Sequence, residues 1–174
     1  MLVKGPGCCG LQIDTTRGSS ISVFEVRPVE EAYAELGRRS LRLPALGIGK
    51  ACPVTPITSE MTFRGFLVDV AGEGPVYKAG RGGRGIWVSD ARELGPILIR
   101  GGRVDGPGEL RFDAGLGPST ELRLPIHSFV YSARQPPGWR QFISSLDLPA
   151  PGCYAVQIDT LTRTDFLVFA VAPE

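Results

Sequence analysis

LPAPGCYAVQIDTLTRTDFLVFAVAP, residues 148–173, is the stretch of sequence that decides the fold. From Tyr154 to Asp159 apolar and polar side chains alternate, which is the period-two pattern of a strand with one face on a core. After a polar turn that begins at Thr160, six apolar residues run from Phe166 to Val171. A short apolar run of this kind is typical of a strand covered on both faces. The two segments predict a terminal β-hairpin whose first strand is half-buried.

The same pattern occurs near the beginning of the chain. Residues 6–26 align without a gap on residues 151–171 and share ten identities in 21 positions. Average composition would give roughly one or two, so this is an internal repeat, and it repeats the closing hairpin alone. A two-stranded hairpin by itself is marginally stable in water. We therefore interpret residues 1–27 as the end of a missing upstream copy, and expect this hairpin to dock on the domain, to pair with another chain or to be poorly ordered.

The composition favours one all-β domain of ordinary size with an appendage. The chain has 174 residues, and its 23 glycines and 15 prolines lie between apolar runs, as in proteins made of many short strands. Nineteen basic and 18 acidic residues leave a net charge of +1, which creates no global field to attract nucleic acid, anionic membranes or acidic substrates. We therefore expect no nucleic-acid partner.

The sequence leaves the location of the protein open. No apolar segment approaches the ~20 residues of a membrane span, so we expect no membrane insertion. The N-terminal residues lack the apolar region of a signal peptide. The expected location is cytoplasmic if Met1 is the true start, and secreted or in the cell envelope if an export signal lies upstream.

Between the two copies the sequence predicts a short helix and a series of strands. Pro28 and the acidic residues that follow it begin a helix over 29–36, which Gly37 would stop. Residues 28–39 are expected to form a helical linker, and residues 40–174 the domain proper. Candidate strands, separated by glycine and proline turns, are 62–70, 76–78, 85–89, 97–101, 109–113, 121–126, 128–132 and 140–146. The predicted fold class is all-β: an immunoglobulin-like β-sandwich with a short helical connector and an extra N-terminal β-hairpin.

Several motifs, in their order, resemble a family of bacterial exported proteins without an assigned chemistry. The motifs are CPVTP (52–56), GPVYKAG (74–80), IWVS (86–89), GPILIRGGRVDGPGELRF (95–112), LRLP (122–125), GWRQF (138–142) and PGCYAVQID (151–159). Members of this family carry a CPVT-type opening, a strand pair with a D-G-P turn, and a closing PGCY or PGCW hairpin, usually behind an export signal. The resemblance covers roughly residues 40–174 and implies an exported immunoglobulin-like domain. This chain departs from the family in lacking the export signal and in carrying the spare hairpin.

The four cysteines are the most informative polar residues. A bridge between Cys52 and Cys153 would close a loop of about 100 residues, which loop-closure entropy values at about 4–5 kcal/mol. By alternation Cys153 points away from Tyr154, so the bridge would pin the segment around Cys52 to the outer face of the strand. The alternatives are two thiols that never meet, or a metal site, although no CxxC spacing is present. Cys8 matches Cys153 in the repeat, so we expect it to be an unpaired thiol or to form a vicinal pair with Cys9.

A catalytic role would have to use His127, which is the only histidine. A hydrolase would need Cys153 or Ser128 as its nucleophile and a carboxylate such as Asp147 or Asp159 to orient the imidazole ring. The sequence has no G-x-S-x-G elbow, no paired histidines for zinc and no phosphate-binding loop. The favoured interpretation of His127 is structural, and we expect no catalytic residue, no metal and no cofactor.

Two tryptophans are the candidate ligand contacts. Trp87 alternates with Ile86 and Val88 and faces outward if those two face the core, while Trp139 follows a Pro-Pro-Gly turn. Exposed aromatic residues can stack on sugar rings or anchor a protein partner; packing in the core or at an edge is the favoured alternative.

The RGGRG run at 81–85 predicts a flexible hairpin loop with solvated arginines, since RNA-tracking segments of this type work through many repeats.

These patterns predict a non-enzymatic binding or structural module of a bacterial envelope or secreted protein, with a protein or a carbohydrate as its partner. The first alternative is a carbohydrate-binding module, which an exposed Trp87 or Trp139 in a shallow groove would favour. The second is a hydrolase that uses His127. A separate hypothesis concerns assembly: residues 6–26 could add to a sheet edge of a neighbouring molecule and give a strand-exchanged homodimer.

Overall fold

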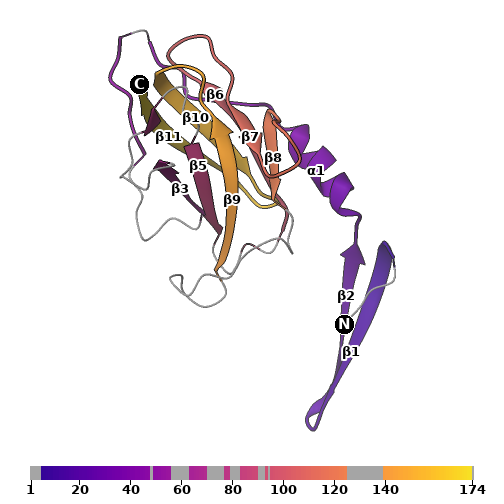
Figure 1. Cartoon of the computed structure of the whole chain (residues 1–174). Helices are drawn as coiled ribbons and strands as arrows, with labels where there is room; N and C mark the ends of the chain where they lie inside the picture. The colour runs from indigo at the N-terminus through magenta and orange to yellow at the C-terminus, as the bar shows by residue number, and fades with distance from the viewer. Residues whose placement is uncertain are drawn as a thin grey trace.

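The computed structural model describes residues 5–47, 49–55, 63–69, 77–78, 83–89, 93, 95–124 and 139–173, with the backbone alone for 63–69 and 77–78. Its elements are β1 (Gly7–Thr15), β2 (Gly18–Val26), α1 (Val29–Gly37), β3 (Phe63–Asp69), β4 (Tyr77–Lys78), β5 (Gly83–Ser89), β6 (Ile97–Arg103), β7 (Arg111–Asp113), β8 (Glu121–Leu124), β9 (Arg140–Asp147), β10 (Gly152–Asp159) and β11 (Thr164–Ala172) (Figure 1). The candidate strand at 128–132 lies outside the described residues. Each of the other candidate strands corresponds to an observed one, with ends that differ by up to two residues.

Two sheets face each other across one hydrophobic core. Within the described ranges one sheet has the order β4-β11-β10-β6-β8 and the other the order β3-β5-β9-β7. Neighbouring strands are antiparallel except β11 and β4, which are parallel. The core takes Trp87 and Phe112 from the second sheet and Ile99, Tyr154 and Phe169 from the first. The predicted all-β sandwich is confirmed, and its assignment as immunoglobulin-like stays a prediction.

Strand β10 lies between β6 and β11 and is buried on both faces, so the prediction of a half-buried strand is wrong. Tyr154 and its alternate neighbours face the core, as the pattern predicts. The opposite face, which carries Gln157 and Asp159, is buried as well. The reason is that residues 39–47 and 49–55, which we call the strap, are bound to this face of β10 and β11. Polar residues that look solvent-facing in the sequence are therefore covered by another part of the chain.

The long motif at 95–112 crosses from one sheet to the other. Its first half is β6, which pairs with β10 and β8, and its second half is β7, which pairs with β9 in the facing sheet. The two halves are linked by the isolated bridge between Gly102 and Glu109. The D-G-P turn between them is therefore a corner of the sandwich.

The prediction of a loop at 81–85 needs correction, because residues 83–85 belong to β5. Arg84 is exposed, as expected of a solvated arginine, and residues 81 and 82 lie outside the described part of the chain. The indole ring of Trp87 packs directly against Gly85, because a Cβ atom on Gly85 would lie 2.8 Å from the ring. Glycine at this position is therefore required by core packing, and the Arg-Gly pattern of the sequence does not indicate that role.

The helix predicted over 29–36 is present as α1, one residue longer, and it packs on the outer face of the β6–β8 region. Tyr33 and Leu36 contact Leu98 of β6. Arg123 of β8 lies over the Tyr33 ring, 5.3 Å from its centroid, and donates a 2.9 Å hydrogen bond to Glu30. Burial raises the pKa of Tyr33 to about 12. The segment predicted as a linker therefore also covers part of the sheet.

Hairpin β1–β2 forms a two-stranded sheet of its own and projects away from the sandwich (Figure 1). Its pairing register is that of β10–β11. Gly7 lies opposite Val26 as Gly152 lies opposite Val171, and the correspondence continues along the whole ladder. Gly7 and Gly152 share a positive φ, at 141° and 149°, so the corner before the strand is repeated too. The sequence repeat is thus a repeat of structure.

Candidate functional site

The predicted bridge between Cys52 and Cys153 is present, with the two Cα atoms 5.4 Å apart. It lies on the outer face of β10, as alternation predicts, in a small apolar cluster with Val168 and Leu43 that is separate from the main core. The strap is also held there by the backbone N–H of Thr55, which donates to the Val168 carbonyl at 2.9 Å. The disulfide therefore fastens the strap to the closing hairpin.

A polar group on the same face of β10–β11 holds the next part of the strap. The side-chain oxygen of Gln157 accepts a 2.7 Å hydrogen bond from the backbone N–H of Arg42, and its amide nitrogen donates to the Ser40 carbonyl at 3.1 Å. The same nitrogen donates to Asp159 at 2.9 Å, and the Thr164 hydroxyl donates to Asp159 at 2.7 Å. We call Gln157, Asp159 and Thr164 the clamp.

The carboxylate of the clamp is fully buried and binds an arginine of β6. Arg100 donates to Asp159 at 2.8 Å and to the carbonyl of Arg39 at 2.9 Å, just beyond the end of α1. Burial raises the pKa of Asp159, but hydrogen bonds from Thr164, Arg100 and Gln157 outweigh burial and hold the pKa below its ordinary value. The clamp thus joins β6, β10, β11 and the strap.

Hairpin β1–β2 carries the same polar group with nothing bound to it among the described residues. The amide nitrogen of Gln12 donates to Asp14 at 2.9 Å, and the hydroxyl of Ser19 donates to the same carboxylate. These two hydrogen bonds lower the pKa of Asp14. All three side chains are exposed, whereas their counterparts Gln157 and Asp159 are buried against the strap and Arg100.

The apolar residues of β1–β2 are exposed in the same comparison. Ile13 is 46% exposed and its counterpart Ile158 is 2% exposed; Val23 is 67% exposed and its counterpart Val168 is 8% exposed. Cys8, which corresponds to the bridged Cys153, is an exposed free thiol, as expected for an unpaired cysteine. Leu11 and Ile21 are also exposed. Of the three alternatives for this hairpin, docking on its own domain is not seen among the described residues, and pairing with another chain stays a prediction. The hairpin is the candidate functional site.

The structure places some of the residues singled out for ligand contact or catalysis. Trp87 is fully buried in the core and its ring nitrogen donates to Ser144 at 2.9 Å, so the prediction of ligand contact is wrong for this residue and core packing is confirmed. Trp139 is half-buried, and its role as a ligand contact stays a prediction. Asp147 is exposed at the end of β9. His127 and its neighbour Ser128 lie outside the described residues.

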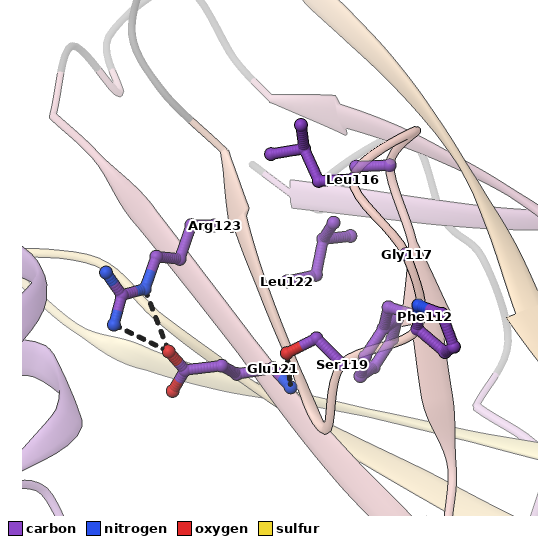
Figure 2. Close-up of a pocket in the computed structure, with 9 residues that line it drawn as sticks. Phe112, Leu116, Gly117, Ser119, Glu121, Leu122 and Arg123 are labelled. Atoms are coloured by element: carbon purple, nitrogen blue, oxygen red, sulfur yellow. Dashed lines mark hydrogen bonds and ion pairs between the residues drawn. The ribbon is translucent and has the colours of Figure 1, made fainter.

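Figure 2 shows an open cavity of about 360 Å³ beside β8, between the β7–β8 turn and the strand. Leu116 and Leu122 line it, with Leu116 almost fully exposed. Its charged lining residues are already paired: Arg123 contacts Glu121 at 2.7 Å and Glu30 at 2.9 Å. The cavity therefore offers an apolar hollow without a free charge to orient a ligand.

Comparisons with other proteins give a structural similarity alone. No family model matches the chain, and no curated protein matches it. The chain is similar in structure to “a Putative Lipoprotein from Bacillus anthracis”, with 13% sequence identity and a TM-score of 0.44 over 80% of this chain and 91% of that chain. Within the described residues, no cluster of three or more His, Cys, Asp or Glu side chains is placed to hold a metal ion. No helix in that part of the chain is long and apolar enough to cross a membrane.

Proposed function

We propose that this chain is a non-enzymatic binding or structural module of a bacterial envelope or secreted protein, and that hairpin β1–β2 is its means of assembly. The observation that carries the proposal is the exposure of the hairpin. It leaves Leu11, Ile13, Ile21 and Val23 in solvent, although burying one such side chain contributes about 1.5–3 kcal/mol. Leu11 and Ile13 lie on one face of the hairpin and Ile21 and Val23 on the other, so both faces are apolar and exposed. Exposed apolar residues on a strand that has a free edge are typical of a protein interaction site.

Two features support the location. The bridge between Cys52 and Cys153 is of the kind that forms and persists in oxidising compartments and is rare in the cytosol. The order of motifs over residues 40–174 resembles exported bacterial proteins. In this proposal the disulfide fixes the strap, and the strap in turn keeps Gln157 and Asp159 of the clamp buried.

Expression of the whole chain in two compartments tests this proposal, with thiol trapping to report whether the bridge is oxidised. The protein is expressed in a bacterial cytosol and, behind an export signal, in the periplasm, and folded material is measured by its resistance to protease. We expect resistant protein with an oxidised bridge in the periplasm, and a smaller resistant fraction in the cytosol. A Cys52→Ser variant should remove the difference between compartments. Equal resistance of reduced and oxidised wild-type protein would contradict the proposed location.

A further inference from the structure

The partner of β1–β2 can be inferred from what closes around its copy. In the sandwich, the edge of β10 that faces away from β11 pairs with β6. Gln157 lies opposite Arg100 in that register. The strap covers the outer face, and Cys52 of the strap bonds to Cys153. The inner face, with Tyr154, meets the other sheet across the core. The first two of these neighbours, β6 and the strap, meet groups that β1–β2 repeats: a strand edge with a glutamine, and a cysteine.

The hairpin presents the matching groups in the same register. Gln12, Asp14 and Ser19 already hold the hydrogen-bonded arrangement of the clamp, and the edge of β1 away from β2 is unpaired among the described strands. Cys8 occupies the position of the bridged cysteine and carries a free thiol. An isolated hairpin needs none of these features. A strand with an arginine opposite Gln12, and a strap with a cysteine facing Cys8, would satisfy all of them.

Two differences argue against this chain's own sandwich as the partner. The position of Tyr154, whose hydroxyl donates to Ala150 at 2.8 Å, is taken by Cys9 in the repeat. The position of the core residue Leu167 is taken by Ser22. If β1–β2 displaced β10–β11 from a second copy, the core would lose an aromatic ring and a leucine side chain, and the displaced hairpin would be left exposed. The partner must therefore supply larger side chains of its own at these two places.

We propose that β1–β2 is the closing hairpin of a second β-sandwich domain, which has the architecture of residues 28–173 but lacks a closing hairpin of its own. This domain presents an edge strand with an arginine opposite Gln12, a strap whose cysteine bonds to Cys8, and bulky core residues opposite Cys9 and Ser22. The inference rests on the proposed assembly role of the hairpin and names its partner. It makes this chain a link between two sandwich domains.

Formation of the bond at Cys8 is an oxidation. The two thiols give up two protons and two electrons to oxidised glutathione, which is cleaved to two glutathione thiols, and a sulfur–sulfur bond forms between Cys8 and the strap cysteine. The attacking species in this exchange is a thiolate, and a mixed disulfide with glutathione is the intermediate.

The probe for the test is a tandem protein in which residues 28–147 are followed directly by residues 3–174. This keeps the natural spacing, because residue 3 aligns with residue 148 in the repeat. The leading unit lacks β10–β11 and has only β1–β2 available to close it, while the trailing unit is the complete sandwich. After refolding with oxidised and reduced glutathione, peptide mapping measures the Cys8–Cys52 bond, and calorimetry measures the unfolding enthalpy relative to the natural chain.

The proposal predicts a Cys8–Cys52 peptide in the tandem protein and an unfolding enthalpy approaching twice that of the natural chain. Because the leading core was built around Tyr154 and Leu167, the paired changes Cys9→Tyr and Ser22→Leu should increase the bonded fraction. Asp14→Ala should decrease it severalfold, and Arg17→Ala in the hairpin turn, as the matched control, should leave it unchanged. A tandem protein with a free Cys8 and an unchanged enthalpy, even with the paired changes, would overturn the proposal.

Light scattering of the natural chain decides the remaining alternative. We expect a monomer whose Cys8 reacts with a thiol reagent. A homodimer joined by Cys8–Cys52 bonds would overturn the proposal in favour of strand exchange with a second copy. Neither measurement depends on the compartment of the protein, so failure of the proposed location and failure of this inference are distinguishable.

Discussion

Replacing Arg100 with alanine is the sharpest test of the clamp. The substitution removes the arginine that faces the fully buried carboxylate of Asp159, and Arg100 itself is only 15% exposed. Removing one partner of a buried ion pair costs about 3–5 kcal/mol, because the other charge stays in a low-dielectric site. Thr164 and Gln157 still donate to Asp159, and the guanidinium of Arg39 remains 3.8 Å from it. We therefore expect a loss of about 3 kcal/mol, the lower end of this range.

The assay is urea unfolding of the whole chain followed by fluorescence of the buried tryptophan, at pH 7. The matched control is Arg123→Ala, which is the same substitution at an arginine of the neighbouring strand. The ion pairs of Arg123 with Glu30 and Glu121 lie at the surface. Exposed pairs contribute about 0–1 kcal/mol. The double variant Arg100→Ala with Asp159→Asn should recover part of the loss, since no charge is left buried. If Arg100→Ala and Arg123→Ala cost the same free energy, the clamp does not hold the strap as described.

The pH dependence of the same variant has a definite sign. In the wild type the pKa of Asp159 is lowered, so its contribution to stability is present above the ordinary aspartate pKa of about 3.9 and is lost as pH falls through the folded-state pKa. Without Arg100 the burial is less well offset, and the pKa of Asp159 rises. The gap in unfolding free energy between wild type and Arg100→Ala should therefore narrow as pH falls toward about 4. If the difference in unfolding free energy between wild type and Arg100→Ala does not change with pH, Asp159 is not the charged group that Arg100 stabilises.

Three further predictions concern other parts of the chain. Cys52→Ser should lower the free energy of unfolding by about 4 kcal/mol, the value expected for a loop of this length, whereas Cys8→Ser should have no effect on the monomer; urea titration measures both. Gly85→Ala should displace the buried indole, since the added Cβ would lie 2.8 Å from the ring. It should lower the free energy of unfolding by about 1–3 kcal/mol and shift the tryptophan fluorescence to longer wavelength. The control Gly10→Ala, at a position with open space around it, should produce neither effect. Tyr33, with a pKa of about 12, should ionise after an ordinary tyrosine in an ultraviolet titration, and its contribution to stability should be lost as pH rises from about 10 toward that value.

The sequence predicts the strands well because their alternation and the glycine and proline turns between them are local signals. It also predicts the disulfide, since Cys153 lies on the outer side of a strand whose inner side is marked by Tyr154. It fails where burial comes from a distant segment. Gln157 and Asp159 look solvent-facing by their chemistry, but the strap, more than a hundred residues away, and Arg100 of β6 cover them.

The same limit applies to the candidate site. The sequence leaves Trp87 open between core packing, which it favours, and a ligand contact, because alternation gives the two faces of a strand without saying which is inside. The contact of its indole ring with Gly85 is visible only in three dimensions. The clamp does have a signal in the sequence. Its glutamine and aspartate are among the few polar identities shared by the two hairpins, and a polar identity on a strand face is a reason to expect a bound partner there.

Amide hydrogen exchange of the whole chain, resolved at residues 8–14 and 153–159, measures the central claim most directly: β1–β2 repeats the fold of β10–β11 but lacks the neighbours that bury it. The account predicts that the amides of β10 exchange only on global unfolding, and that those of β1 exchange orders of magnitude faster, close to the rate of an isolated hairpin. Equal protection of the two strands in a monomeric protein would contradict it, because the first hairpin would then already be closed by its own chain.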